Sequence, residues 1–186
     1  MKFVYFFGDG KAEGSASMKN ELGGKGANLA EMTNLNIPVP PGFTLTTETN
    51  TAYFETGGDL PAEAVDQTKE AMANVEKIMG RNFGDAENPL LVSVRSGARM
   101  SMPGMMETVL NVGLCTATIP GMIKQSGNER FVYDAYRRLI TMYSDVVMEK
   151  AGGVEPEEGK GIRVQLEHLL EAVKEEKGYK NDTDLT

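Results

Sequence analysis

The sequence predicts an α+β fold in which strands and helices alternate up to Val112 and helices alone follow. Two observations predict it. Short runs of β-branched and aromatic residues, which are typical of strands, occur before Val112 and cease after it. Apolar residues then recur at every third or fourth position, as on one face of an amphipathic helix. We therefore expect a mixed sheet with helices in residues 1–112 and a helical part in residues 113–186.

The composition is that of an ordinary globular protein. The chain has 186 residues, of which 40% are apolar and 25% are charged, and its formal net charge is −8. Because the basic residues form no long run, we expect no nucleic-acid partner, and any anion site must be a local cluster of positive charge. The only cysteine, Cys115, excludes an internal disulfide and a multi-cysteine metal site. No run of about 18 apolar residues is present, so we expect no membrane-spanning segment and a cytoplasmic location.

The first part begins with a strand over residues 2–7, which are aromatic and β-branched. After a Gly-Asp-Gly turn and a polar loop, the second half of residues 21–32 has helical spacing. This places Gly-Gly-Lys-Gly, residues 23–26, at a helix start. Free backbone N–H groups at a helix start attract anions, and glycines let a phosphate approach the backbone. Residues 23–26 with Lys25 therefore form either an anion site or an ordinary turn with a surface lysine.

The middle of the first part continues the alternation. Prolines exclude a helix over residues 37–42 and favour an extended segment, and residues 43–46 read as a strand. Thr47 is the predicted N-cap of a short helix. The next helix is expected to begin at Pro61 and to end at Gly80. Its predicted buried stripe consists of Val65, Met72, Val75 and Met79.

The most informative stretch runs from Leu90 to Leu114. Residues 90–94 are predominantly apolar and predict a buried strand, and residues 108–112 predict a second one. Between them lie Arg95, Arg99 and a methionine-rich loop with a Pro-Gly break. A guanidinium group presents a planar fork of donors that matches phosphate oxygens. The stretch is therefore either a phosphate clamp at the base of a loop or a surface hairpin whose arginines point into solvent.

The second part is expected to be helical. It contains at most a short helix around residues 120–124, then a long helix over residues 129–150 capped by Asn128, and a helix over residues 162–177. The only histidine, His168, lies on the polar flank of the last helix, so we interpret it as a solvent-exposed residue. The positions predicted to be buried are Phe131, Ala135, Leu139, Met142, Tyr143 and Val146 on the long helix and Leu166, Leu169, Leu170 and Val173 on the last.

The last residues of the chain, 181–186, have the composition of a helix cap with no helix after it. Two amphipathic helices also need a third element to close a core between them. We therefore expect the sequence to be the front part of a longer protein.

Several motifs, in the correct order, resemble the N-terminal region of the pyruvate, phosphate dikinase family. They are Glu13-Gly14 and residues 22–32, 39–44, 91–99, 101–106, 133–138 and 142–147. The related phosphoenolpyruvate synthases and glucan water dikinases share the Gly-Gly-Lys and Val-Arg-Ser elements. They are not similar in the Gly-Ala-Arg-x-Ser-Met-Pro-Gly-Met-Met sequence at residues 97–106, which favours the dikinase family itself.

The resemblance implies part of an ATP-grasp nucleotide-binding domain, in residues 1–112, followed by an inserted helical subdomain. The complete enzyme interconverts ATP, phosphate and pyruvate with AMP, pyrophosphate and phosphoenolpyruvate through a phosphohistidine on a separate domain. By motif, Lys25 and Arg95 bind the ATP phosphates. The loop that covers the nucleotide would comprise Ser96, Gly97, Ala98, Arg99, Ser101, Met102 and Gly104.

The same resemblance implies that much of the enzyme lies outside this chain. The ligands of Mg²⁺, the phosphohistidine domain and the pyruvate-binding domain are all expected beyond Thr186, so we expect no catalytic residue and no metal ligand among the 186 residues. The implied partners are ATP, phosphate, pyruvate, the phosphohistidine domain of the same chain and further copies in a homo-oligomer. Two alternatives stay open: a fragment of a sister dikinase such as phosphoenolpyruvate synthase, and a non-catalytic helical interaction module.

Overall fold

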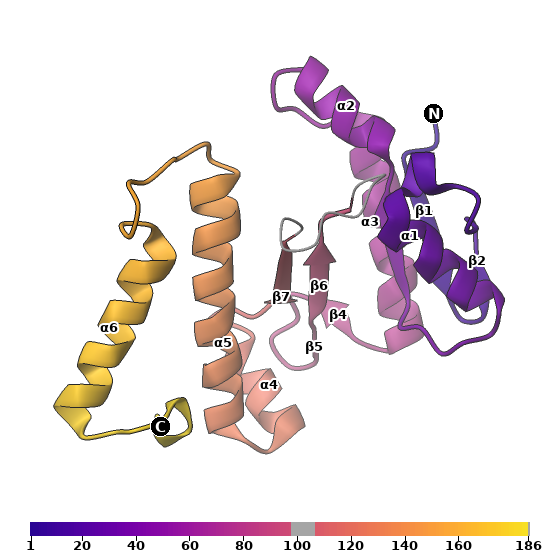
Figure 1. Cartoon of the computed structure of the whole chain (residues 1–186). Coiled ribbons are helices and arrows are strands. Elements are labelled where there is room, and N and C mark those ends of the chain that lie inside the picture. Colours follow the sequence, from indigo (N-terminus) through magenta and orange to yellow (C-terminus); the bar gives the residue numbers. More distant parts are fainter. Residues whose placement is uncertain (98–106, 186) are drawn as a thin grey trace. The chain divides into compact units, whose positions relative to one another are not determined.

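The computed structural model describes residues 1–97 and 107–185, which form two units with separate cores (Figure 1). The first unit contains Met1–Asn82 and the segment that begins at Ser96. The second contains Phe83–Arg95 and the residues from Glu107 onward. The chain therefore crosses between the units more than once.

The first unit is built on a three-stranded sheet with strand order β2-β1-β3. The central strand β1 (Val4–Gly8) pairs antiparallel with β3 (Gly42–Leu45) along its length and with β2 (Lys11–Ala12) at its end. Aromatic and β-branched residues favour such a half-buried pleated surface, and the two longer strands were predicted for that reason. The short strand β2 was not predicted, because two residues carry no alternation of apolar and polar positions.

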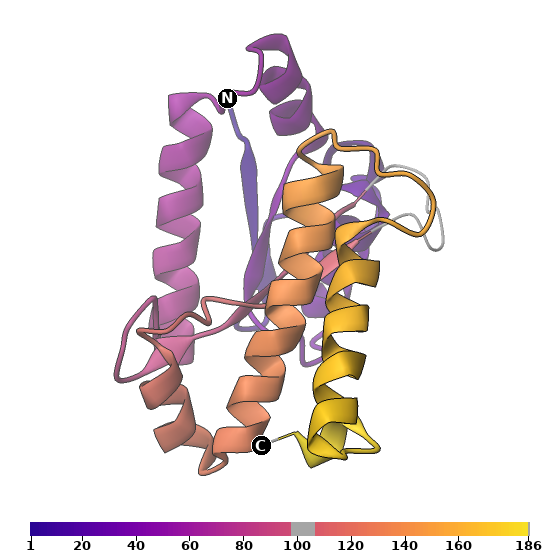
Figure 2. The ribbon, with the colours of Figure 1, turned by 90° about the vertical axis from the view of Figure 1, so that its left-hand side faces the viewer.

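Helices α1 (Lys19–Asn34) and α3 (Ala62–Met79) lie on opposite faces of this sheet (Figures 1 and 2). Between them in sequence is α2 (Thr47–Glu55), which begins one residue earlier than predicted. Its N-cap is Thr46 rather than Thr47, because the Thr46 hydroxyl accepts a hydrogen bond from Thr49 N at 3.3 Å. The first unit is thus a small sheet between two layers of helix.

Helix α3 buries small side chains rather than the predicted stripe of larger ones. Ala64 and Ala71 are buried together with Phe3 and Val4, next to the sheet. Methyl side chains let the helix backbone approach Phe3, Val4 and Phe43 closely. Of the predicted stripe only Val75 is buried: Val65 and Met72 are half-buried, and Met79 is 41% exposed. The predicted end of the helix at Gly80 is confirmed, since Gly80 adopts a left-handed conformation with φ of 63°.

The second unit begins with short strands. The hairpin strands are β6 (Val92–Arg95) and β7 (Thr108–Val112), which pair antiparallel. A further two-stranded sheet joins β4 (Asn82–Phe83) to β5 (Pro89–Leu90). The described residues therefore form three small sheets instead of the single mixed sheet that the sequence predicted.

The strand predicted over residues 90–94 is buried only at its beginning. Leu90 is 3% exposed, whereas Val94 is 56% exposed. A two-stranded sheet shields its residues less than a central strand of a larger sheet would, so apolar composition alone overestimated the burial of this strand.

Beyond residue 115, the described part of the chain is helical, as the loss of strand signals predicted. Asn128 is, as predicted, the N-cap of the helix that begins at Glu129, because its Oδ1 accepts a hydrogen bond from Phe131 N at 2.9 Å. The helical segments are α4 (Ile119–Ser126), α5 (Glu129–Tyr143), the π-helix η1 (Ser144–Lys150), α6 (Ile162–Lys177) and the 3₁₀ turn η2 (Asp182–Asp184). Of the predicted capping residues at 181–186, Asn181 caps η2 and forms a reciprocal capping box with Asp184.

The predicted buried face of the long helix is confirmed in part, since Ala135, Met142 and Val146 pack against the core. Leu139 is buried as expected, but Val132 is 1% exposed while Phe131 and Tyr143 are 53% and 47% exposed. Successive residues of a helix are about 100° apart, so Val132 faces the core while its neighbour Phe131 does not. The buried apolar residues of this core are Val109, Leu114, Ile119, Val132 and Leu139.

Helix α6 packs beside α5 and η1 (Figure 2) and buries less than predicted. Leu166 and Leu170 are half-buried, but Leu169 and Val173 are exposed. Its buried residue is instead Lys174, whose ammonium group contacts Asp182 Oδ1 at 2.5 Å. Hydrogen bonds from Lys174 to Asp182 and Glu171 raise the pKa of Lys174, against the opposing effect of its burial.

A buried carboxylate joins η1 to the start of α6. Asp145 is 4% exposed, and its Oδ2 accepts hydrogen bonds from Arg163 Nε at 2.8 Å and Arg163 Nη2 at 2.6 Å. Lys150 Nζ lies 3.3 Å from Asp145 Oδ1 and 2.6 Å from Glu107 Oε1. Burial of Asp145 opposes its ionisation, but Arg163 and Lys150 outweigh this effect and lower its pKa.

The substitution Asp145→Asn should destabilise the protein by about 1–3 kcal/mol at pH 7, because it removes charge-assisted hydrogen bonds of a buried carboxylate. A carboxyl group with a lowered native pKa stabilises the fold above its unfolded pKa, about 3.9 for aspartate. The difference in free energy of unfolding between wild type and variant should therefore shrink as the pH falls through the native pKa. Urea unfolding at pH 7, 5 and 3.5 measures it.

The matched control is Asp66→Asn, which makes the same chemical change in an exposed ion pair with Lys69. Exposed pairs contribute little, so this variant should unfold within about 0.5 kcal/mol of wild type. A difference for Asp145→Asn as small as that of the control, or unchanged between pH 7 and 3.5, would contradict the role assigned to Asp145.

Candidate functional site

Gly23 interrupts α1 two residues before Lys25. Its φ of 68° and ψ of 171° lie outside the helical region, in a conformation that residues with a Cβ atom rarely adopt. A short helical turn over Lys19–Leu22 precedes the break, and the main helical segment begins at Gly24. The prediction that residues 23–26 lie at a helix start is therefore confirmed. Backbone N–H groups in the first turn of a helix are suited to binding an anion.

Lys25 links this helix start to the predicted loop. Its side chain is half-buried, and its Nζ donates a hydrogen bond to the carbonyl oxygen of Ser96 at 2.8 Å. Both residues belong to the first unit. A lysine ammonium group has three N–H donors, so the contact with Ser96 leaves two for a ligand. Within residues 1–97 and 107–185, Lys25 forms no ion pair with a carboxylate that would neutralise it.

The glycine-rich turn also rests on β3. A Cβ atom added to Gly26 would lie 2.7 Å from Thr44 Cγ2 and 2.8 Å from Thr44 Oγ1, closer than real Cβ atoms approach. Helix α1 can therefore contact β3 at this point only because residue 26 is glycine. A few residues away, the Thr47 hydroxyl donates a hydrogen bond to the carbonyl oxygen of Asn20 at 2.7 Å, which holds the turn before the Gly23 break.

Sequence reasoning missed these two threonines. It interpreted the stretch as a strand followed by a helix cap, because alternation and capping are local signals. The contacts that Thr44 and Thr47 make join residues 18 and 27 positions apart, and no periodicity reports them. The one signal that could have found them was the glycine at residue 26, since a glycine inside a helix often marks a close approach.

Arg95 occupies the last position of β6, opposite Thr108. Its side chain is exposed, and among the described residues it has no hydrogen-bond or ion-pair partner. Arg95 belongs to the second unit and Lys25 to the first, so their approach to one ligand stays a prediction. Of the predicted covering loop, Ser96 and Gly97 are described and exposed. Ala98, Arg99, Ser101, Met102 and Gly104 lie outside the described residues.

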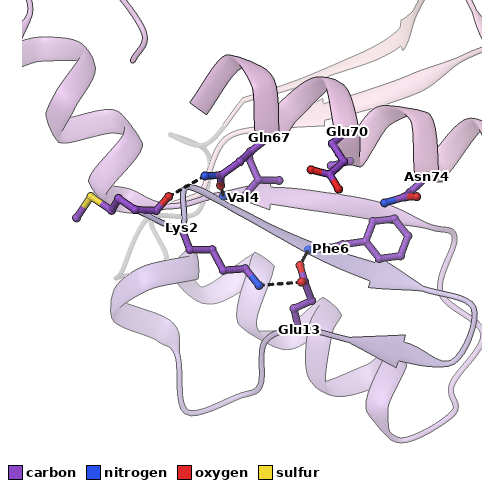
Figure 3. A pocket seen from close by; sticks show the side chains of 9 residues that line it. Lys2, Val4, Phe6, Glu13, Gln67, Glu70 and Asn74 are labelled. Atoms are coloured by element: carbon purple, nitrogen blue, oxygen red, sulfur yellow. Dashed lines mark hydrogen bonds and ion pairs between the residues drawn. The ribbon is translucent and has the colours of Figure 1, made fainter. Parts of the chain in front are cut away.

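A hollow of about 660 Å³ lies between β1 and α3 (Figure 3), and Lys25 does not line it. Lys2 donates to Glu13 at 2.7 Å across it, and Glu70 and Asn74 face it from α3. Burial opposes ionisation of Glu13, but the hydrogen bonds from Lys2 and Phe6 N outweigh it and lower its pKa. The hollow does not suit a polyphosphate, because Glu13 neutralises Lys2 and Glu70 adds a second carboxylate. It is lined by Met1, Lys2, Val4, Phe6, Glu13, Gln67, Glu70, Ala71 and Asn74.

The donor set around Lys25 suits an anion and not a divalent cation, which prefers carboxylate oxygens. In the part of the chain that the structure describes, no group of three or more histidine, cysteine, aspartate or glutamate side chains could hold a metal ion. Among the described helices none is long and apolar enough to cross a membrane. His168, predicted to be exposed, is exposed on α6.

Comparison with known proteins agrees with the motifs. Residues 19–68 match the family model described as pyruvate phosphate dikinase, AMP/ATP-binding domain. Over 185 residues and 100% of its length, the chain is 53% identical to a pyruvate, phosphate dikinase of Clostridium symbiosum and 50% identical to one of Rhizobium meliloti (strain 1021). It is 49% identical to the chloroplastic pyruvate, phosphate dikinase 1 of Zea mays.

The match concerns only the N-terminal region of these relatives. The chain covers 20%, 19% and 18% of their respective lengths, so it spans about a fifth of the curated relatives it matches. The matched family segment begins at α1 and ends within α3, and it includes the Gly23 break, Lys25 and Thr44. The resemblance to pyruvate, phosphate dikinase is thereby confirmed along the whole chain.

The substitution Gly23→Ala should destabilise the protein by about 1–3 kcal/mol, because a Cβ atom is strained at this φ and ψ. Equilibrium urea unfolding measures it. The control is Asn20→Ala, an exposed position three residues earlier that keeps its backbone carbonyl for Thr47, and it should unfold like wild type. A Gly23→Ala variant as stable as the control would show that α1 is not broken at this residue.

Proposed function

We propose that this chain, which matches the N-terminal region of pyruvate, phosphate dikinases along its whole length, forms the ATP-binding part of such an enzyme. The observation that carries the proposal is the 53% identity over 185 residues to the Clostridium symbiosum enzyme. The family model that matches residues 19–68 is described as an AMP/ATP-binding domain, which supports ATP as the ligand.

Lys25 and Arg95 are the residues proposed to bind the ATP phosphates. Phosphoryl transfer needs positioning and charge neutralisation more than covalent chemistry from the protein, so ammonium, guanidinium and backbone N–H donors are suitable groups. The contact between Lys25 and Ser96 supports this assignment, because it places a cation at the first residue of the proposed covering loop. Arg95, the residue before Ser96, supplies a guanidinium group whose donors have no partner among the described residues.

In the proposed enzyme, residues 1–112 contribute part of an ATP-grasp domain and residues 113–186 an inserted helical subdomain. The reaction is the interconversion of ATP, phosphate and pyruvate with AMP, pyrophosphate and phosphoenolpyruvate. The phosphohistidine, the pyruvate site and the carboxylates that hold Mg²⁺ are proposed to lie beyond Thr186, since His168 sits on an exposed helix face outside the family motifs. A cytoplasmic homo-oligomer is the expected state.

Two alternatives remain open. A sister dikinase of the phosphoenolpyruvate synthase type would also use a Gly-Gly-Lys turn, but the three relatives described above are all named pyruvate, phosphate dikinases. A non-catalytic helical interaction module would make no use of Lys25 or Arg95, so substitution of these residues separates it from both dikinases.

The purified 186-residue chain should release no AMP from ATP and form no phosphoenolpyruvate, because the proposed acceptor histidine and metal ligands are not on it. A chimera that joins this chain to the remaining part of the Clostridium symbiosum enzyme serves as the active reference. Chromatographic assay of AMP in both samples tests the expectation. AMP production by the chain alone, at a rate comparable with the chimera, would refute it.

In the chimera, Lys25→Ala or Arg95→Ala should slow phosphorylation of the histidine by ATP roughly ten- to a hundredfold. Each variant loses a charge-assisted phosphate contact worth about 1.5–3 kcal/mol. Transfer from the phosphorylated histidine to pyruvate should be nearly unchanged, because it does not involve the ATP site. Single-turnover kinetics of the two half-reactions measures both rates.

The matched control is Lys19→Ala, which removes an exposed lysine from the same helix and should leave both half-reactions intact. Equal slowing of the two half-reactions in Lys25→Ala or Arg95→Ala, or an unchanged ATP half-reaction, would mean that these residues are structural. In that case the proposed phosphate site is wrong.

A further inference from the structure

We propose that Thr44 is a positioning residue for Lys25. Because Gly26 has no side chain, Thr44 packs directly against the backbone of α1 at this residue. This contact fixes the glycine-rich turn and the helix start against β3. The inference rests on the proposed function of Lys25 as a phosphate-binding residue. Thr44 is the last residue of the Val-Pro-Pro-Gly-Phe-Thr motif at residues 39–44.

The contact between Gly26 and Thr44 leaves no space for a larger side chain at residue 26. The position of a Cβ atom on Gly26 would be 2.7 Å from Thr44 Cγ2, 2.8 Å from Thr44 Oγ1 and 3.2 Å from Leu22 Cβ. Gly26 itself is buried, and the two threonine atoms belong to a short β-branched side chain with one rotatable bond. Neither partner can therefore give way without moving its backbone, and α1 and β3 are fixed relative to each other at this point.

The strand that carries Thr44 is itself held against β1. Thr44 lies opposite Tyr5 in the sheet. A Cβ atom on Gly42 would be 2.8 Å from Phe7 Cζ, so the phenylalanine ring packs directly on the strand backbone. A Cβ atom on Gly8 would likewise be 2.7 Å from Pro41 Cβ. Residues 41–44 therefore pack tightly on β1, which fixes the position of Thr44.

Lys25 precedes Gly26, so any shift of the helix at Gly26 moves both the Lys25 backbone and the N–H groups of the first turn. The long lysine side chain can compensate for part of such a shift, but the backbone donors cannot. Ligand contacts of this kind are sensitive to displacements of about 1 Å, which can reduce function about a hundredfold. Thr44 acts through Lys25 and the helix start, and it need not touch the ligand itself.

The test is a size-compensation experiment on the 186-residue chain. Gly26→Ala adds the methyl group that clashes with Thr44. Thr44→Ala removes Cγ2 and Oγ1, and the double variant puts the new methyl group into the vacated space. Two readouts are needed: the nuclear Overhauser contact between the Lys25 side chain and Ser96 in the ligand-free protein, and calorimetric affinity for inorganic tripolyphosphate. Thermal unfolding of each variant accompanies them.

Gly26→Ala should lose the contact between Lys25 and Ser96 and should bind tripolyphosphate roughly tenfold more weakly, as expected for one misplaced charge-assisted contact. Thr44→Ala should weaken binding about threefold, because it removes the contact between Thr44 and Gly26 without displacing the helix. The double variant should regain the contact and bind within about twofold of wild type, better than either single variant. The control Thr51→Ala, at an exposed threonine, should change neither readout.

A lower unfolding temperature for Gly26→Ala with unchanged affinity and an unchanged contact to Ser96 would overturn the inference, as would a double variant no better than Gly26→Ala. Lys25→Ala is measured in parallel. It distinguishes failure of the inference about Thr44 from failure of the proposed function of Lys25. If Lys25→Ala binds tripolyphosphate like wild type, or wild type does not bind it, the phosphate role of Lys25 is wrong. The contact between Lys25 and Ser96 alone then decides whether Thr44 positions the lysine.

Discussion

The close approach of α1 to β3 at Gly26 and Thr44 is the constraint on which the candidate site depends. It sets how near the helix start lies to the sheet, and it requires both a glycine on the helix and a short side chain on the strand. The Gly23 break, two residues before Lys25, lets the chain turn into that helix start. The two glycines therefore do different work: one supplies a backbone conformation, and the other supplies space for a neighbour.

The second unit is held in a different way, by charge as well as by apolar packing. Its core lies among β7, α4 and α5, and α6 adds few buried apolar side chains to it. In place of them, Asp145 accepts two hydrogen bonds from Arg163, and Asp182 lies near both Lys174 and Arg137. These hydrogen-bonded ion pairs fix how α6 and η2 lie against α5 and η1, because the few apolar contacts of α6 would leave its angle and register loosely specified.

An anion site in a chain of net charge −8 has to be assembled locally. A helix start carries partial positive charge on its backbone N–H groups, and Lys25 adds a full charge beside them. The hollow between β1 and α3 has the opposite property, since its lysine is bound to Glu13 and a second carboxylate faces it. The helix start at Lys25 therefore suits an anion and the hollow does not, because of the charges that line each of them.

The sequence by itself determined the local features: the class of each longer element, the caps at Asn128 and Gly80, the helix start at residues 23–26 and the family motifs. These follow from the conformational preferences of single residues and their near neighbours. Only the tertiary structure decided that Val132 and not Phe131 enters the core, that three small sheets form, and that Lys25 contacts Ser96 while Gly26 rests on Thr44. Periodicity cannot fix a helix face to within one residue, and contacts between residues 18 to 71 positions apart depend on packing that no local pattern encodes.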